Sequence, residues 1–540
     1  MKRYSIMAVA LLALAPAVQA QSAIDMLQLT QPSFRGTARF MGMGGAFTAL
    51  GGDLSTLTQN PAGIGVYRHS DIGVTLDIDM QSTKSPDGQG GWNKDDNTRV
   101  DCNNFGYVGV ADLGDYSVMP FFSWGVTYNR QASFDRTYKA YAPRTNTSLT
   151  NYIASYSNGI PAGDLNFGTD YNPYRDSDLD WLSILAYNSF MMNEQPGSTD
   201  SYRGLYDNGT TVGDADIDVH EKGYVDEYSI NFGGNVMNTL YWGLGIGITD
   251  LSYRRDVVYS ESMQDAQVYS QYSSTNTATG NAGYYLDNYK KITGSGWKLS
   301  FGLIYRPVDA LRIGAAIHSP TWWSLDQEYE GAVDYSYTNA STGDTRTGNE
   351  TTDWASFSWR LKSPWRFMVG AAAVIGQNAI ISVDYEHQSF SDMTCKNAIY
   401  DNYGYETDYR ENKPVNEDVK TYCKGADIIR VGAEYRVTPV FSVRAGYNYT
   451  TSYIKKDARD NVMQIITAGT DPSYEFAKDS QNITFGLGYK YNNFYIDGTY
   501  VHHMRTSDLH AYTSFNGNDA PAWQVKDSNN SIVLTVGYRF

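Results

Sequence analysis

The chain has 540 residues and a formal net charge of −17 at pH 7, which argues against a nucleic-acid partner because such a partner favours a basic patch. Tyrosine (45 residues) and glycine (50 residues) are abundant and 14% of the residues are aromatic, yet the mean hydropathy is only −0.45. A transmembrane β-barrel explains this combination, since its lipid-facing and lumen-facing side chains alternate and the average hydropathy stays low.

The chain begins with a pattern typical of a secretory signal peptide. Lys2 and Arg3 precede an apolar run, and small residues follow at Val18 and Ala20. We expect cleavage after Ala20, so residues 1–20 are excluded from the fold. Beyond them, no stretch approaches the roughly 18 consecutive apolar residues of a membrane helix.

Residues 21–69 lack the alternation of a strand and are rich in glycine. The sequence predicts two short helices, around 46–50 and 54–59, with Asp53 as the N-cap of the second. Asn60-Pro61 would end that helix, because proline disfavours helical backbone in the residue before it. The segment "GMGG" does not complete a GxGxxG motif and no βαβ pattern follows, so nucleotide binding is excluded.

From residue 71 onward, apolar and polar residues alternate. In "DIGVTLDIDM" the even positions from Ile72 to Met80 are apolar, whereas the odd positions carry Gly, Thr and Asp. A strand between lipid and a polar lumen has this pattern. It recurs along the chain and predicts fourteen strands, near 70–80, 103–112, 118–137, 220–237, 240–260, 289–306, 310–332, 352–376, 378–391, 426–437, 440–453, 481–491, 494–508 and 530–540.

The connections between these strands alternate between short turns and long loops. Outer-membrane barrels have this topology, with short periplasmic turns and longer outer loops. The stretch from Ala355 to Ile375 keeps its parity past Pro364, which predicts one strand that is longer than a bilayer requires. The terminal strand is predicted to pair with the first, so that no strand edge remains in lipid.

The segment "MGMGGAFTALGGDLSTLTQNPAGI" resembles the N-terminal hatch of the FadL/TodX family of outer-membrane transporters for hydrophobic compounds. Further similarity lies in "LSFGLIYRPVDALRIGAAIHSP", "PWRFMVGAAAVIGQNAIISVDYEHQSFSDM", "IIRVGAEYRVTPVFSVRAGYNY" and the terminal "VGYRF". The loops 138–219 and 392–425 show no match. The resemblance implies a fourteen-stranded barrel formed by residues 70–540 and plugged by residues 21–69, with Asn60, Pro61 and Ala62 in the plug. It also implies inward transport of long-chain fatty acids or other hydrophobic molecules.

The same resemblance implies a lateral exit through a break in the third strand, which begins "SVMPFFSWGVTYN". Pro120 has no N–H to donate to a neighbouring strand, and Gly125 weakens the ladder. We therefore place the exit beside Pro120 and Gly125. The alternative is that Pro120 only marks the start of the strand.

The loop 138–219 contains the apolar stretch "LDWLSILAYNSFMM" at near-helical spacing. One interpretation is a surface groove that captures the hydrophobic ligand, formed by Trp181, Leu182, Leu185 and Phe190. Exposed apolar surface of this size would need such an explanation. The other interpretation is a helix that packs the loop's own small core.

Charged side chains are predicted to face the lumen, at Asp77, Asp384, Glu386, Arg430, Glu434, Arg436 and Arg444. They form either a paired polar lattice, since buried charges need partners, or a site where one arginine meets a fatty-acid carboxylate. A lumen-facing His318 could ligate haem. The adjacent His502 and His503 point to opposite strand faces and cannot share a metal.

Cys395 and Cys423 lie in one predicted outer loop, which in an oxidising compartment predicts a disulfide between them. No CxxC motif indicates a metal or redox site. No GxSxG motif occurs and no nucleophile stands beside a base, so an enzyme is not expected.

Together these features predict an all-β outer-membrane protein of a Gram-negative bacterium that passively takes up hydrophobic compounds. The expected partners are hydrophobic small molecules, outer-membrane lipids and the barrel assembly machinery, with no nucleic acid, cofactor or metal. Two alternatives stay open: a haem-uptake barrel, and a non-transporting barrel that scaffolds surface or secretion partners.

Overall fold

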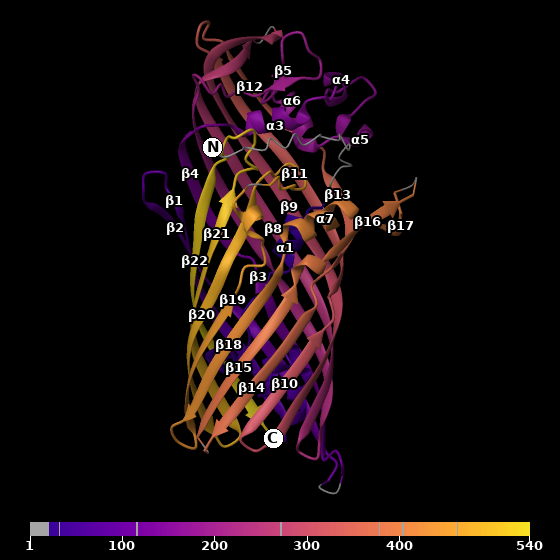
Figure 1. The fold of residues 1–540 in the computed structure, drawn as a ribbon, viewed down its shortest axis with the longest axis vertical. Helices are drawn as coiled ribbons and strands as arrows, with labels where there is room; N and C mark the ends of the chain where they lie inside the picture. Colours follow the sequence, from indigo (N-terminus) through magenta and orange to yellow (C-terminus); the bar gives the residue numbers. More distant parts are fainter. Residues whose placement is uncertain are drawn as a thin grey trace, which may run out of the picture.

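The computed structural model describes residues 21–540 except 32, 115–116, 271–272, 377, 402–403 and 462, and the side chains of 269–270 and 273–277 are also left undescribed. The predicted signal peptide, residues 1–20, lies outside the described residues. Within the described part, the chain forms a closed antiparallel barrel of fourteen strands with a helical segment inside it and a helical cap at one end (Figure 1).

The barrel closes where β1 (Asp71–Pro86) pairs with β22 (Ala522–Arg539), which confirms the predicted role of the terminal strand. The other wall and loop strands are β2 (Trp92–Asp112), β3 (Phe121–Ser133), β4 (Arg136–Thr145), β7 (Val212–Val236), β8 (Leu240–Ser270), β9 (Ser273–Val308), β10 (Leu311–His318), β11 (Trp322–Asn339), β12 (Thr345–Thr351), β13 (Ala355–Lys362), β14 (Arg366–Ile375), β15 (Ala379–Ser389), β16 (Thr394–Tyr400), β17 (Glu406–Glu411), β18 (Gly425–Arg436), β19 (Phe441–Thr450), β20 (Tyr474–Tyr491) and β21 (Phe494–His510). A separate small sheet pairs β5 (Asn193–Glu194) with β6 (Tyr202–Arg203).

The helices lie inside the barrel and at its outer end, where the long loops gather (Figure 1). They are α1 (Ala23–Leu29), α2 (Ala38–Gly42), α3 (Leu149–Ser157), α4 (Ala162–Leu165), α5 (Pro173–Asp176), α6 (Trp181–Asn188), α7 (Lys413–Tyr422) and α8 (Lys456–Arg459), with 3-10 turns η1 (Leu54–Thr58), η2 (Pro61–Val66) and η3 (Phe390–Asp392). None of the helices in the described part of the chain is long and apolar enough to span a membrane.

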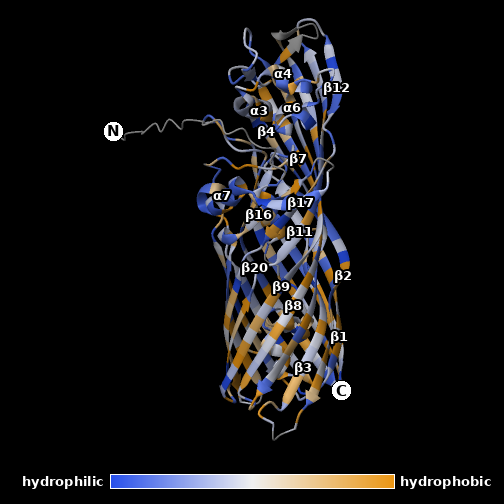
Figure 2. Cartoon of the chain, turned by 90° about the vertical axis from the view of Figure 1, so that its right-hand side faces the viewer, coloured by the Kyte–Doolittle hydropathy of each residue, from blue (hydrophilic) through white to orange (hydrophobic). Residues whose placement is uncertain are grey.

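Outward-facing side chains in the lower half of the wall are apolar. Leu76, Val431 and Leu534 are 47%, 40% and 46% exposed, whereas their neighbour Asp77 is 1% exposed. Figure 2 shows hydrophobic residues recurring along the strands of this half of the barrel. The predicted alternation between a lipid-facing and a luminal side is therefore confirmed.

All fourteen predicted strand positions are occupied in the wall, two of them (310–332 and 352–376) by two shorter strands each, and several strands extend much further outward than predicted. β8 has 31 residues and β9 has 36, far more than the about 9–11 residues that cross a bilayer. Their outer parts, together with those of β7 and β11, form a tall wall that carries α3 to α6 (Figure 1).

The prediction of one strand from Ala355 to Ile375 is wrong. The wall has two strands there, β13 and β14, separated at residues 363–365, where Pro364 lacks an N–H for the ladder. The neighbouring wall position breaks at the same level, between β10 and β11, beside Pro320. Ser363 N donates to Thr321 O at 3.1 Å, and Thr321 N donates to Ser363 Oγ at 2.8 Å, so two hydrogen bonds between these residues link the two breaks.

The N-terminal segment fills the lumen below its middle. Met41 and Phe47 are 2% and 0% exposed, and the wall binds the backbone of α2 directly, because Thr484 Oγ1 donates to Gly42 O at 3.2 Å. Asp53 caps η1 as predicted. The predicted helix at 46–50 is wrong: these residues form turns between α2 and η1.

Candidate functional site

Asn60, Pro61 and Ala62 lie inside the barrel, at the start of η2. The Asn60 side chain caps this turn by accepting from Ala62 N at 3.0 Å. Its Nδ2 donates to Thr48 O at 2.6 Å and to Leu303 O on β9 at 3.3 Å. Asn60 thus joins two parts of the N-terminal segment to the barrel wall.

Glycines of the wall make this close approach possible. A Cβ at Gly302 would stand 1.8 Å from Asn60 Oδ1, and a Cβ at Gly243 would stand 2.2 Å from Pro61 O. Only glycine leaves room for backbone at these distances. Glycines on the luminal faces of β8 and β9 therefore dock the N-terminal segment, a role that alternation alone did not reveal.

The luminal charges form a paired lattice. Glu386 accepts from Arg366 at 2.7 Å and from Arg430 at 2.5 Å. Glu434 accepts from Arg444 at 2.7 Å and from Arg39 of α2 at 3.0 Å. The predicted lattice that holds strands and plug is therefore present, although Arg436 is exposed rather than luminal.

Within the described residues, the backbone ladder between β2 and β3 covers only part of the two strands. It runs from Asp112 paired with Phe121 to Asn104 paired with Asn129. Beyond Asn104, β2 pairs only with β1, and beyond Asn129 β3 pairs only with β7. We call this interruption, between residues 96–103 of β2 and 130–135, the seam.

Two bulges set the seam apart from the regular wall. Asn103 is skipped in the pairing of β2 with β1, and Gln131 is skipped in the pairing of β3 with β7. A bulge bends its strand and increases the local twist, so the two strands diverge here. Asn103, turned inward by its bulge, is fully buried.

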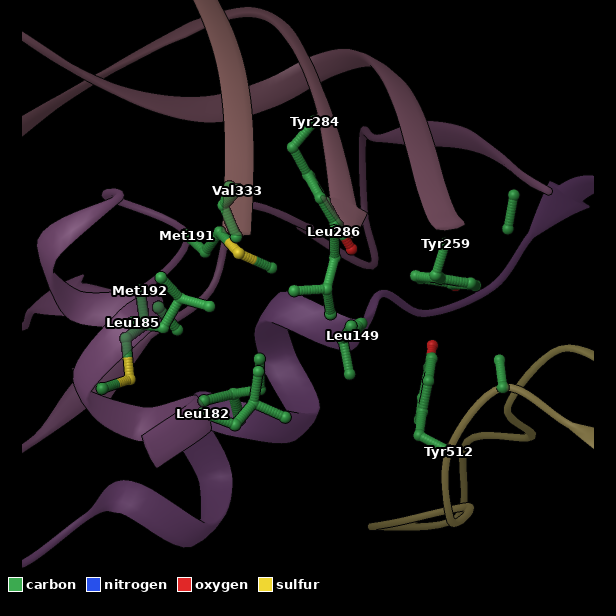
Figure 3. Close-up of a cluster of buried hydrophobic side chains, with 14 of the residues drawn as sticks. Leu149, Leu182, Leu185, Met191, Met192, Tyr259, Tyr284, Leu286, Val333 and Tyr512 are labelled. Atoms are coloured by element: carbon green, nitrogen blue, oxygen red, sulfur yellow. The ribbon is translucent and has the colours of Figure 1, made fainter. Parts of the chain in front are cut away.

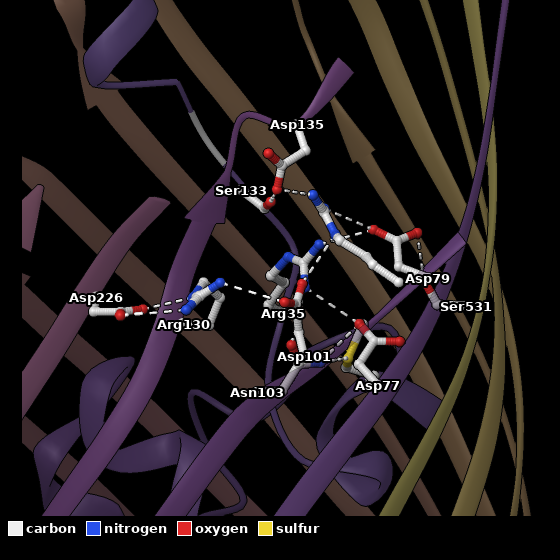
Figure 4. Close-up of polar contacts among 12 residues, drawn as sticks. Arg35, Asp77, Asp79, Asp101, Asn103, Arg130, Ser133, Asp135, Asp226 and Ser531 are labelled. Atoms are coloured by element: carbon white, nitrogen blue, oxygen red, sulfur yellow. Dashed lines mark hydrogen bonds and ion pairs between the residues drawn. The ribbon is translucent and has the colours of Figure 1, made fainter. Parts of the chain in front are cut away.

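Ion pairs bridge the seam in place of backbone hydrogen bonds (Figure 4). Arg130 Nη1 of β3 lies 3.5 Å from Asp101 of β2, and Arg99 of β2 pairs with Asp135. From the lumen, Arg35 of the N-terminal segment reaches Asp79 at 2.9 Å, and its Nη1 lies 3.5 Å from Asp101. Figure 4 shows Arg35 in the middle of this network, so the plug contacts Asp101, the same residue that Arg130 binds across the seam.

A cavity of about 180 Å³ lies between the N-terminal segment and the wall, with Ala132 to Arg136 beside the seam among its lining residues. Its lining is mixed: charged Arg35, Asp79 and Arg505 occur together with apolar side chains, which are Phe34, Met41, Phe134, Ile428 and Val501. A second cavity of about 130 Å³ shares Arg430 and Ile428 with it. Arg430 Nη1 is buried and has no hydrogen-bond partner among the described residues.

The stretch predicted to capture ligand forms the core of the outer cap. Trp181, Leu182 and Leu185 lie on α6 and are buried, at 8%, 4% and 0% exposure. Figure 3 shows Leu182 and Leu185 facing Leu149 of α3 and the side chains of the wall. Phe190 is half-buried, with the Arg346 guanidinium 4.1 Å above its ring. The prediction of an exposed capture groove made of these residues is therefore wrong, because α6 packs into the core of its own loop instead.

The break predicted at Pro120 and Gly125 is also absent. Pro120 lies directly before β3, so it marks the start of the strand. Gly125 pairs with Val108 on one side and Asn231 on the other, within an unbroken ladder. Its missing side chain serves the plug, because a Cβ there would stand 3.3 Å from Ile64 Cδ1. The interruption of the wall beside the third strand lies further outward, at the seam between β2 and β3.

The predicted disulfide is absent, since Cys395 and Cys423 are both free and buried. They pack with α7 and β13 in one hydrophobic cluster, where each behaves as a small apolar side chain. Burial raises the pKa of both thiols to about 12. The two cysteines were predicted to be bonded because they lie in one loop. They do lie in the same hydrophobic cluster, but they are not bonded.

His318 faces the lumen as predicted and is fully buried. Its Nε2 lies 2.7 Å from Gln59 O of the N-terminal segment. The ring therefore contacts the plug rather than standing free as an axial ligand, which weighs against the haem alternative.

Sequence reasoning missed the seam, although its charges were visible. Arg35, Arg99, Asp101 and Arg130 are not among the predicted site residues, and only the tertiary structure brings them together. The available signal was the failure of strict alternation near Asn103 and Gln131, where the bulges lie.

No family model matches the sequence, and no curated protein matches it. Among solved structures, a Pseudomonas aeruginosa FadL homologue matches with a TM-score of 0.50 at 13% identity, over 95% of this chain and 100% of that chain. The P. putida toluene transporter TodX matches with a TM-score of 0.46 at 13% identity, over 94% and 99% of the two chains. The Ralstonia pickettii toluene transporter TbuX matches with a TM-score of 0.43 at 14% identity, over 94% and 98%. The likeness to the FadL homologue extends over both chains, and with the closed wall and its apolar belt it shows that this protein is an outer-membrane β-barrel of the FadL-like fold.

Proposed function

We propose that this protein is an outer-membrane channel for the passive uptake of hydrophobic compounds. The observation that carries the proposal is the seam, because it places an interruption of the barrel wall directly beside a luminal cavity. The fold shared with a FadL homologue supports the same function. The structures of TodX and TbuX are described as toluene transporters.

The proposed route enters from the outer end, passes the cavity between the plug and the wall and leaves through the seam. A hydrophobic molecule gains nothing from release into water, since its apolar surface favours leaving water. The seam lies at the level of Ile78 and Val100, which are exposed on the outer face of the wall. A molecule leaving there would enter the bilayer directly. This route replaces the exit beside Pro120 and Gly125.

The cavity lining favours an amphipathic ligand such as a long-chain fatty acid. Apolar side chains offer contacts to a tail, and Arg430 retains a buried donor without a partner. A carboxylate would satisfy that donor in a charge-assisted hydrogen bond. A pure hydrocarbon would leave it unsatisfied, at a cost in binding free energy.

Movement of the plug is the proposed opening step. Arg35 ties residues 21–69 to Asp77 and Asp79 of β1 and to Asp101 of β2. Displacing Arg35 would leave the carboxylates of Asp77, Asp79 and Asp101, on the paired strands β1 and β2, without this positive charge, and their repulsion would loosen the wall beside the seam. The surface step stays without assigned residues, because Trp181, Leu182 and Leu185 are buried in the core of the cap.

The test is to bridge the seam and measure uptake. In a Cys102→Ser background, Asp101→Cys and Arg130→Cys are joined by a short bifunctional maleimide in cells. Uptake of radiolabelled oleate is then compared before and after bridging. We expect bridging to abolish uptake, whereas bridging Asp326→Cys to Ser358→Cys, which face each other on paired strands of the outer wall, should leave it unchanged.

Two results would count against the proposal in different ways. Unchanged uptake in the bridged seam variant would exclude the lateral route but not the channel. No uptake of oleate or toluene by the parent protein, with the barrel folded in the outer membrane, would exclude the channel. Haem binding to the purified parent protein would favour the haem-uptake alternative.

A further inference from the structure

A cavity of about 300 Å³ lies at the opposite end of the lumen from the seam, below the plug. Its wall residues stand at the short-turn ends of strands, among them Arg312 of β10, Val374 of β14 and Arg539 of β22. Gly51 and Gly52 of the plug line its inner side. In an outer-membrane barrel the short turns face the periplasm, so this cavity opens on the periplasmic side.

The polar lining of this cavity has a single sign of charge. Four arginines and His69 line it, and among the described residues no Asp or Glu does. The arginines are Arg39, Arg68, Arg312 and Arg539. In a chain with a formal net charge of −17, such a concentration of positive charge is not a consequence of composition.

Two of these arginines already have carboxylate partners outside the cavity lining. Arg39 pairs with Glu434 at 3.0 Å, and Arg539 pairs with Asp71 at 3.1 Å. Arg68 and Arg312 form no ion pair with any described residue. The cavity therefore keeps two guanidinium charges that the protein does not neutralise.

The hydrogen bonds of Arg312 leave one buried donor free. Arg312 Nη1 donates to Leu50 O at 2.8 Å, while its Nε is buried without a partner among the described residues. Arg68 donates to the carbonyl oxygens at the end of η2 and to Asn238. If Arg312 only anchored the plug, its hydrogen bond to Leu50 would suffice, and burying its unpaired Nε would only destabilise the folded state.

Much of the remaining lining is apolar. Leu50 and Val66 of the plug and Val374 and Ile380 of the wall are among its lining residues. Volumes from about 300 Å³ upward are typical of small-molecule sites. The site therefore combines an arginine cluster, suited to a planar or tetrahedral oxyanion, with a short apolar wall suited to the first carbons of a chain.

We infer that the periplasmic cavity binds the anionic head of an amphiphile, a carboxylate or phosphate attached to an acyl chain. Arg312 and Arg68 hold the head group, and the apolar wall holds the adjoining methylenes. The inference does not rest on the transport route, because this cavity lies on the other side of the plug from the seam. Two sources share this chemistry: a free fatty acid and an anionic phospholipid of the inner leaflet.

The test uses photo-crosslinking with peptide mapping on the folded, purified protein in dodecyl maltoside. One arm adds palmitic acid that carries a diazirine near its carboxylate, and the other adds phosphatidylglycerol with the diazirine at the same place. We expect cross-links on the peptides that contain Val374 and Ile380. Arg312→Gln should reduce them about tenfold, as expected for loss of a charge-assisted hydrogen bond.

Arg306→Gln is the matched control, since Arg306 also stands at a strand end of the same rim but does not line the cavity. It should leave the cross-links unchanged, and so should Arg430→Gln, which alters only the upper cavities. Arg68→Gln provides a second variant if Arg312→Gln does not fold. The probe that cross-links to these peptides, palmitic acid or phosphatidylglycerol, identifies the source of the head group.

Three results would overturn the inference: equal labelling of Arg312→Gln and the parent, equal loss in Arg306→Gln, or equal labelling by an uncharged diazirine-bearing alkyl maltoside. The first two would show that these arginines do not select the ligand. The third would show that the apolar wall binds any chain. Failure of oleate uptake in cells would leave this binding result untouched, so the two proposals fail separately.

Discussion

Arg35 of the N-terminal segment and Asp79 of β1 form an ion pair of 2.9 Å inside the barrel, with side-chain exposures of 12% and 4%. The same guanidinium reaches Asp77 and Asp101. One side chain of the plug thus pairs with carboxylates on β1 and β2, the strands on one side of the seam. Because Asp101 also binds Arg130 across the seam, this relationship links the position of the plug to the wall beside the seam.

Replacing Arg35 by methionine should loosen the plug. The change keeps the apolar stem but leaves Asp77 and Asp79 without this partner, and breaking a buried pair in this way costs about 3–5 kcal/mol. We expect a higher mean conductance and more frequent current fluctuations in planar bilayers. Lys94→Met is the control, since Lys94 pairs with Asp96 on the exposed surface. A conductance equal to that of the parent would show that Arg35 does not hold the plug.

Gly125 offers a test of the contact between the third strand and the plug. A Cβ at this position would stand 3.3 Å from Ile64 Cδ1 of the plug, and 3.0 Å from Tyr107 O and 3.1 Å from Val108 Cγ2 of β2, so Gly125→Val should overpack the lumen and lower the free energy of unfolding by about 1–3 kcal/mol. Gly498→Val is the matched control, because nothing lies within 4 Å of a Cβ there. Urea unfolding of both variants in lipid vesicles measures the difference. Equal stability of the two variants would contradict the packing described here.

The sequence was sufficient to predict the barrel because its signal is local. Alternation along strands such as β1 and β18 reports the contrast between lipid and lumen residue by residue, and the strand order follows from the alternating loop lengths. The break at Pro364 could not be predicted, because the alternation of apolar and polar residues continues in phase across it. The sequence pattern therefore gave no sign of an interrupted ladder.

The candidate site depended on contacts between distant segments, which alternation does not encode. Leu182 and Leu185 have the same spacing in a capture groove as in a buried helix, and only the packing of α3 against α6 decides between them. Likewise Arg35 and Asp101 are far apart in the chain, and their contact follows from the docking of the plug. The hatch assignment of Asn60 rested on resemblance, and its mechanical role remains a prediction.

Cys395 and Cys423 should be found as free thiols in the native protein. Because burial raises the pKa of both to about 12, the reactive thiolate is scarce at pH 8. We expect no alkylation by iodoacetamide before unfolding and complete alkylation of both after unfolding, with or without reductant. Non-reducing peptide mapping provides the readout. A peptide pair joined through these two cysteines would refute the structure at this point.

Leu534 should be sensitive to charge because it faces lipid. It pairs with Leu76 across the closing contact of β1 and β22, and Leu534→Arg near the bilayer midplane should cost about 2–4 kcal/mol. Ile399→Arg is the control, because Ile399 is exposed on the β16 hairpin in the outer region, where a surface change should stay within about 0.5 kcal/mol. Unfolding in lipid vesicles should separate the variants, and equal costs would place Leu534 outside the membrane belt.

Helix α7, in the loop between β17 and β18, should be more stable in mild acid. Burial raises the pKa of Asp418 on this outer helix to about 6, a shift that a hydrogen bond with Tyr422 partly offsets. The folded state therefore binds this proton more tightly than the unfolded state, so the free energy of unfolding is largest below pH 4 and falls as the pH rises to about 6. Two pKa units correspond to about 2.7 kcal/mol, and partial exposure of the carboxyl reduces the expected change to about 1 kcal/mol.

Asp418→Asn keeps the side chain neutral at every pH and should remove this dependence. We expect hydrogen exchange of the α7 backbone, corrected for the intrinsic rate, to be about fivefold slower in the variant than in the parent at pH 7, since 1 kcal/mol is about that factor in an equilibrium constant. At pH 4 the two should agree. Glu417→Gln on the exposed side of the same helix is the control and should not reproduce the change. If the ratio of the exchange rates of parent and Asp418→Asn stayed constant across this pH range, the ionisation of Asp418 would not affect the stability of α7.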